Sequence, residues 1–166
     1  MFQSVLLLAC VLSVGQAENL WDKFKNLQRS KETICVRGKV TCQSEPELPE
    51  TKIQLYDLDF FNGNDFMGAA SPDPDGVYNV CGTGRDWFLD VNGNIEPELR
   101  IYTKCGQDKE QNCFRELVFA IPEAIGKESY TFRDFEMSMT GRWSTDIRRC
   151  FTESQTHELL NNRNSE

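Results

Sequence analysis

The cysteines are the residues of this chain whose possible chemistry is clearest from the sequence. Seven occur among 166 residues, and six of them follow residue 17: Cys35, Cys42, Cys81, Cys105, Cys113 and Cys150. None forms a Cys-x-x-Cys motif, and the single histidine, His157, stands near the C-terminus. The sequence therefore contains no motif for a zinc site, for thiol redox chemistry or for histidine-dependent catalysis. An even set of cysteines in an exported chain instead indicates three disulfides, with fifteen possible pairings.

Acidic residues suggest calcium binding as a second chemistry. Asp57, Asp59 and the segment Asp73–Gly76 look like pieces of an acidic calcium loop, but the twelve-residue pattern needs a glutamate at its last position. Counted from Ser71, that position is Gly82. A tight turn between strands explains the Pro-Asp-Gly sequence directly. We therefore expect no metal site and no cofactor.

Basic and aromatic side chains are the remaining candidates for ligand binding. The basic candidates, which would meet an anionic lipid head group or a sulfated glycan, are Arg100, Lys104, Arg115, Arg148 and Arg149. The aromatic candidates, which gather around two predicted loops, are Phe60, Phe61, Phe66, Trp87 and Phe88. The alternative for the basic set is a solubilising strand face, and for the aromatic set a cap on the ends of the core.

Composition narrows the class of protein. The net charge is −8 and the chain is 39% hydrophobic, which is enough to build one core and argues against a disordered chain. A nucleic-acid backbone would be repelled by most of this acidic surface. We expect one small globular domain that does not bind nucleic acid.

The two ends of the chain differ from its middle. Residues 1–17 are uncharged with a short apolar run, which predicts a secretory signal peptide rather than a transmembrane segment, since a membrane span needs roughly 20 apolar residues. Residues 18–33 form an N-terminal extension with helical spacing of apolar residues. Residues 151–166 are polar and are expected to be a disordered tail. The protein is expected to be secreted.

Between these ends, short apolar or alternating runs are separated by turn residues at regular intervals, which is typical of a β-sandwich. The predicted strands are Ile34–Cys42, Lys52–Phe60, Phe66–Ala70, Gly76–Val80, Glu98–Lys104, Phe114–Ile121, Tyr130–Met139 and Arg142–Arg149. Eight strands favour two four-stranded sheets. One short helical turn is expected between Pro122 and Gly126, ended by the glycine.

Alternation assigns the faces of these strands. In the first strand, Ile34, Val36, Val40 and Cys42 share the apolar face that must point inward. Cys35 lies on the opposite, outward face of that strand, and Cys81 is likewise placed outward.

The order and spacing of several segments resemble the nematode transthyretin-like family. The segments are VRGKVTC at 36–42, IQLYDLD at 53–59, DPDG at 73–76, PELRIYTKC at 97–105, CFR at 113–115, Ile121-Pro122 and Arg149-Cys150. The resemblance runs from Ile34 to Cys150 and implies an all-β, two-sheet sandwich of about eight strands with one short helix over residues 34–150. It also implies secretion, extracellular recognition and no established catalysis.

The resemblance also implies a disulfide pattern. In a sheet ordered as in transthyretin, the first and fourth strands are neighbours, so a Cys35–Cys81 bond is expected on the solvent face. Cys105 and Cys113 flank one loop and would close it, which leaves Cys42 to pair with Cys150. Hormone transport in a tetramer channel is disfavoured, because that channel would be lined by the face that carries Cys35–Cys81.

These observations predict a secreted, non-enzymatic binding protein, an extracellular adaptor for a cell-surface protein or an anionic lipid or glycan. The alternatives are a carrier of a small apolar ligand and a secreted effector that binds a receptor. The sequence does not indicate an oligomeric state.

Overall fold

A computed structural model of the chain describes residues 31–45, 47–58, 64–84, 95–106, 112–138 and 145–161. The predicted signal peptide and most of the N-terminal extension lie outside these residues, as do Phe60, Phe61, Trp87 and Phe88. The elements are β1 (Glu32–Thr41), β2 (Thr51–Asp57), β3 (Asp65–Ala70), β4 (Val77–Gly84), β5 (Pro97–Thr103), β6 (Cys113–Ala120), η1 (Pro122–Ala124), β7 (Ser129–Thr131), β8 (Phe135–Glu136), β9 (Thr145–Cys150) and α2 (Glu153–Asn161).

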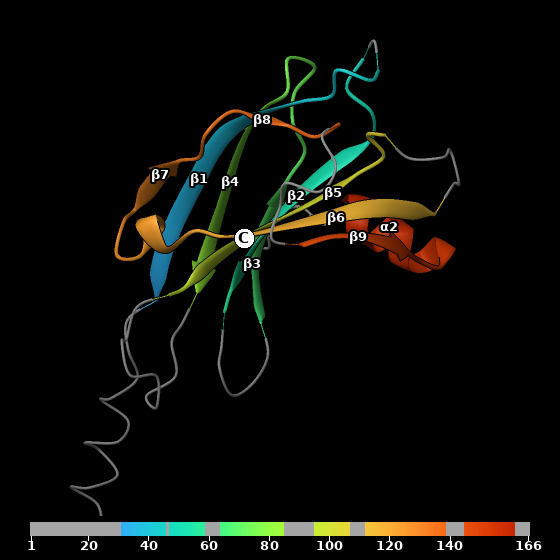
Figure 1. The fold of residues 1–166 in the computed structure, drawn as a ribbon. Coiled ribbons are helices and arrows are strands. Elements are labelled where there is room, and N and C mark those ends of the chain that lie inside the picture. The colour runs from blue at the N-terminus through green and yellow to red at the C-terminus, as the bar shows by residue number, and fades with distance from the viewer. Residues whose placement is uncertain are drawn as a thin grey trace, which may run out of the picture.

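The strands form two sheets that face each other (Figure 1). The smaller sheet has the order β4-β1-β7, and β8 also pairs with β1. The larger sheet is antiparallel, with the order β3-β2-β5-β6-β9. The prediction of an all-β two-sheet sandwich is confirmed.

The core lies between the sheets and follows the predicted alternation. Ile34, Val36 and Val40 of β1 are buried on its inward face, and they meet inward residues of the larger sheet such as Leu55 and Leu99. Burial of these apolar side chains is the main favourable term for the fold.

Two glycines allow close approaches that hold the sandwich together. Gly76 has φ 82° and ends the turn before β4, where a Cβ would stand 2.0 Å from the backbone oxygen of Val40. At Gly82 a Cβ would stand 2.4 Å from Cβ of Met67 on β3, so this glycine lets β4 approach an edge strand of the other sheet.

The end of the chain departs from the predicted strands and tail. The predicted strand Tyr130–Met139 is two short strands, β7 and β8, with Phe132 between them buried in the core. The last strand, β9, pairs with β6, so the larger sheet has five strands rather than four. Residues 153–161 form α2, and the prediction of a disordered tail is wrong for this segment.

The disulfides confirm one predicted pairing and correct two. Cys35–Cys81 is present and staples β1 to β4 at directly opposed positions. The other bonds are Cys42–Cys105 and Cys113–Cys150, not Cys105–Cys113 and Cys42–Cys150.

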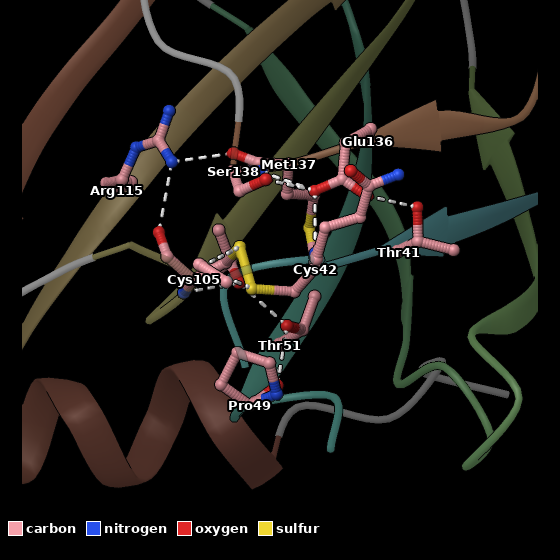
Figure 2. Close-up of a disulfide and its surroundings, with 12 residues drawn as sticks. Thr41, Cys42, Pro49, Thr51, Cys105, Arg115, Glu136, Met137 and Ser138 are labelled. Atoms are coloured by element: carbon pink, nitrogen blue, oxygen red, sulfur yellow. Dashed lines mark hydrogen bonds between the residues drawn. A yellow bond between two sulfur atoms is a disulfide. The ribbon is translucent and has the colours of Figure 1, made fainter. Parts of the chain in front are cut away.

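Geometry explains both corrections. Cys42 and Cys105 point inward from opposite sheets at the same end of the sandwich (Figure 2). Cys113 and Cys150 are opposed in the register of β6 and β9. Because β9 is the edge strand beside β6, Cys150 lies away from Cys42.

Candidate functional site

The candidate site is the outer face of the five-stranded sheet. Alternation places Lys52, Gln54 and Tyr56 of β2 on this face, and the register sets Arg100 of β5 opposite Gln54. Side chains from β6 and β9 continue the same rows. The face divides into a part under α2 and a part that no described helix or strand covers.

The covered part is a small apolar cluster beneath α2. Leu159 of α2 is buried against Tyr102 and Phe114, and the ring of Phe151 meets both aromatic rings edge-on. The Lys52 ammonium donates to the backbone oxygen of Leu160 at 3.1 Å, which satisfies a carbonyl at the C-terminal end of the helix. Figure 1 shows α2 beside β6 and β9.

We call the uncovered part the open face. Its residues are Gln54, Tyr56, Phe66, Glu98, Arg100, Val118, Ala120 and Ile147. Phe66 is 38% exposed on the edge strand β3, and Ile147 is 39% exposed on the opposite edge strand β9. The open face therefore combines aromatic, aliphatic and charged groups on a rigid sheet.

Arg100 is held at the centre of the open face by two neighbours. Its Nε donates to Glu98 Oε1 at 2.7 Å, and its guanidinium lies 4.1 Å from the ring centroid of Tyr56. The Tyr56 ring in turn meets the Phe66 ring edge-on, with centroids 5.6 Å apart. These contacts fix the guanidinium plane against an aromatic shelf.

Glu116 organises the boundary between the open and covered parts. It accepts a hydrogen bond from the Tyr102 hydroxyl at 2.8 Å and another from Arg149 Nε at 2.5 Å. Burial and the hydrogen bond to Glu116 raise the pKa of Tyr102. Burial also raises the pKa of Tyr56, so both phenols stay protonated at neutral pH.

The structure separates the predicted binding residues. Phe66 and Arg100 share the open face, and Arg149 lies at its boundary. Lys104 is near the covered part, where it pairs with Glu50 at 3.2 Å and lies over the Phe114 ring. Arg148 is exposed on β9.

Arg115 does not belong to this surface. It is buried on the inward side, where Nη1 donates to the backbone oxygens of Cys105 and Met137. Its Nε and Nη2 donate to both carboxylate oxygens of Asp146, at 3.2 and 2.7 Å. Figure 2 shows the guanidinium beside the Cys42–Cys105 bond, closing one end of the sandwich. Its role is structural.

Sequence reasoning missed several members of the open face. Gln54, Tyr56 and Glu98 alternate with core residues on β2 and β5, so their common outward face could be read from the strand period. Val118 alternates with Leu117 and Phe119 of β6 and could be added in the same way, but Ile147 could not, because its place depends on which edge β9 joins.

Other chemistry finds little support among the described residues. His157 is exposed on α2. No group of three or more His, Cys, Asp or Glu side chains is arranged to hold a metal ion within the described ranges. A surface hollow near Lys127 is lined mainly by polar and charged residues. A second hollow, near Glu47 and Asp73, is lined equally by polar residues and by leucines and prolines. In the part of the chain that the structure describes, no helix has the length and apolar character to cross a membrane.

The strand order β4-β1-β7 opposite β3-β2-β5-β6 defines a β-sandwich domain of the transthyretin type. The model of the transthyretin-like family matches residues 37–122. The chain belongs to this family.

One curated relative is Transthyretin-like protein 1 of Caenorhabditis elegans, 29% identical over 100 residues. That match covers 56% of this chain and 60% of the relative, so it spans about three fifths of the relative's length. Among solved structures, a 9R-lipoxygenase from Cyanothece PCC8801 matches with a TM-score of 0.43 and 14% identity. The match covers 81% of this chain and 22% of the lipoxygenase, and a likeness of this level carries no argument about function.

Proposed function

We propose that this chain is a secreted, non-enzymatic binding protein that recognises a cell-surface protein through its open face. The observation that carries the proposal is the exposure of Phe66 and Ile147 on the same outer sheet face as the stacked Arg100 and Tyr56. Membership of the transthyretin-like family supports a binding role. Three disulfides support an oxidising, extracellular location.

The composition of the open face suits a protein partner. Aromatic residues and arginine are enriched in the centres of protein interfaces, where each buries a large area. Here Tyr56 and Arg100 are already ordered by their mutual contact and by Glu98. Ordering before binding lowers the entropy lost on association.

The other predicted partners are less well supported. Recognition of an anionic head group would use basic side chains, but Arg100, Lys104 and Arg149 each pair with a carboxylate. A carrier of an apolar molecule would need interior space, and the described interior is filled by core side chains. An effector that binds a receptor would use the same open face and is covered by the same test.

The test compares two exposed β-branched residues on opposite outer faces. Ile147 lies on the larger sheet, and Val77, 48% exposed, lies on the smaller sheet. We expect Ile147→Lys to weaken binding of the labelled, disulfide-bonded protein to intact cells of its source organism by about tenfold or more. Val77→Lys should bind as the unaltered protein does. Flow cytometry measures both.

A third variant, Arg148→Ala/Arg149→Ala, compared with Ile147→Lys, distinguishes the lipid prediction. Phosphatidylserine vesicles in a flotation assay report head-group binding. Vesicle binding that is lost in an Arg148→Ala/Arg149→Ala variant and kept in Ile147→Lys would replace the proposal with lipid recognition. Equal loss of cell binding in Ile147→Lys and Val77→Lys would contradict the assignment to the open face.

A further inference from the structure

The guanidinium of Arg100 is held in place but only partly used. Of its five N–H donors, Nε–H is taken by Glu98 at 2.7 Å. The two Nη groups make no hydrogen bond to a described residue, although the side chain is only 21% exposed. Stacking on Tyr56 fixes the plane in which these four remaining N–H bonds point.

A second donor stands beside this guanidinium. Gln54 is opposite Arg100 in the β2–β5 register and is 4% exposed. Its Oε1 accepts a hydrogen bond from the Tyr56 hydroxyl at 2.9 Å, and its Nε2 has no hydrogen-bond partner among the described residues. The buried side-chain atoms that lack a partner in the described residues do not include this Nε2, so solvent, and therefore a ligand, can reach it.

We propose that Arg100 and Gln54 form a carboxylate-binding site for an acidic peptide segment of the protein ligand. The inference rests on the proposed function, because it names the chemistry recognised by the open face. A carboxylate is planar and accepts two parallel hydrogen bonds from a guanidinium. It would also accept a hydrogen bond from the Gln54 side-chain amide.

The local charge favours a carboxylate over a phosphate. Arg100 is paired with one carboxylate, Glu98, and the neighbouring Arg149 is paired with another, Glu116, so the basic groups here are largely neutralised. A singly charged, planar group suits this balance better than a doubly charged phosphate, which usually needs several basic partners. Phe66 borders the Tyr56 shelf and Ile147 lies elsewhere on the open face, so we expect an apolar residue next to the acidic one.

The net charge of −8 affects how binding of an acidic peptide should depend on salt. An acidic segment and an acidic protein repel each other at long range, so the favourable binding energy must come from short-range hydrogen bonds at Arg100. Added salt should therefore strengthen or leave unchanged the binding of an acidic peptide, the opposite of its effect on a basic patch.

The test uses the ¹⁵N-labelled mature protein with its disulfides intact. The probes are the peptides acetyl-Glu-Leu-Glu-amide and acetyl-Gln-Leu-Gln-amide, which differ in charge but hardly in shape. We expect saturable NMR shifts of the Gln54 side-chain amide and the Val118 amide with the acidic peptide alone. Arg100→Lys should weaken binding about tenfold, because a lysine lacks the planar fork.

Arg37→Lys is the matched control variant. Arg37 is an exposed strand arginine on the other sheet, and its Nε is likewise taken, by Thr131 Oγ1 at 2.9 Å. This variant should bind the acidic peptide as the unaltered protein does. Absence of shifts, or equal shifts with both peptides, would overturn the proposal. Saturation by inorganic phosphate at lower concentration than by the acidic peptide would overturn it in favour of a phosphate ligand.

The two proposals fail separately. If Ile147→Lys abolishes cell binding while Arg100→Lys leaves it intact, the open face is the docking surface and the carboxylate site is wrong. If the acidic peptide binds at Arg100 but Ile147→Lys leaves cell binding intact, the carboxylate site stands and the docking surface is wrong.

Discussion

Arg115 shows how a single basic residue can serve the fold rather than a ligand. Its guanidinium donates to Asp146 on β9 and to two backbone oxygens, one after β5 and one after β8. One side chain thus joins segments of both sheets at the end closed by the Cys42–Cys105 bond. A buried charge of this kind is tolerated only because nearly all its donors are satisfied.

Replacing Arg115 should therefore destabilise the protein strongly. In Arg115→Met, Asp146 and two carbonyl groups lose their donor, and we expect the free energy of unfolding to fall by about 3–5 kcal/mol. Guanidinium denaturation followed by fluorescence measures this. Arg148→Ala, at an exposed position on the same strand pair, should change stability by less than about 1 kcal/mol. A similar loss in both variants would contradict the structural role of Arg115.

Glu136 is the second residue whose chemistry has a measurable consequence. Burial opposes ionisation, but hydrogen bonds from Ser138, Thr41 and the Gln43 backbone outweigh it and hold the pKa of Glu136 below the ordinary value of 4.5 for a glutamate. A lowered folded-state pKa means that the unfolded chain binds the proton more readily. The stabilisation is thus present above the unfolded pKa and lost as the pH falls through the folded one.

Glu136→Gln should remove this pH dependence. The free energy of unfolding of the unaltered protein is expected to fall more steeply from about pH 5 to pH 3 than that of the variant. Urea denaturation at a series of pH values tests this. Glu123→Gln, at an exposed residue of η1, provides the control and should keep the original slope. Parallel curves for Glu136→Gln and the unaltered protein would rule out this contribution.

At the scale of elements, α2 is the clearest departure from the sequence-based expectation. The segment has a recognisable start signal: Thr152 Oγ1 accepts from the Gln155 backbone N–H at 3.3 Å, and Gln155 Oε1 accepts from the Thr152 backbone N–H at 3.0 Å. This reciprocal pair is a capping box. The helix was not predicted because the segment is polar and only Leu159 and Leu160 supply apolar contacts. The stability of the helix therefore depends on the sheet beneath it.

Leu159→Ala should detach α2 while leaving the sandwich folded. The variant loses the buried contact with Tyr102 and Phe114, so we expect hydrogen exchange of residues 153–161 to accelerate by at least about tenfold. Exchange in β2 and β5 should stay slow. Glu158→Ala, at the exposed preceding position, should leave exchange in α2 unchanged. Unaltered protection in Leu159→Ala would show that α2 is not held by this contact.

At the scale of the whole molecule, the three disulfides stabilise different parts of the sandwich. Cys35–Cys81 and Cys113–Cys150 each join neighbouring strands within one sheet, while Cys42–Cys105 joins the two sheets. They connect residues separated by 46, 37 and 63 positions. In the chain-entropy model, closures of this size each stabilise the fold by about 4 kcal/mol.

Peptide mapping under non-reducing conditions should recover these three pairs. A Cys42→Ala/Cys105→Ala double variant should lose about 4 kcal/mol of unfolding free energy by the same model. It should keep the other two bonds, because their partners are opposed in register. A recovered Cys105–Cys113 or Cys42–Cys150 peptide would show that the sheets are joined differently.

The sequence by itself determined most of the strands up to β6, their inward faces and the acidic charge of the surface, because a period of two and the turn residues are local properties. Together with the family resemblance, it also placed Cys35 opposite Cys81. Only the tertiary structure decided that β9 joins β6, that Cys42 meets Cys105, and that α2 covers one part of an outer face while Arg100 remains on the other. These features depend on which distant segments become neighbours in space, and the alternation along one strand carries no information about the strand beside it.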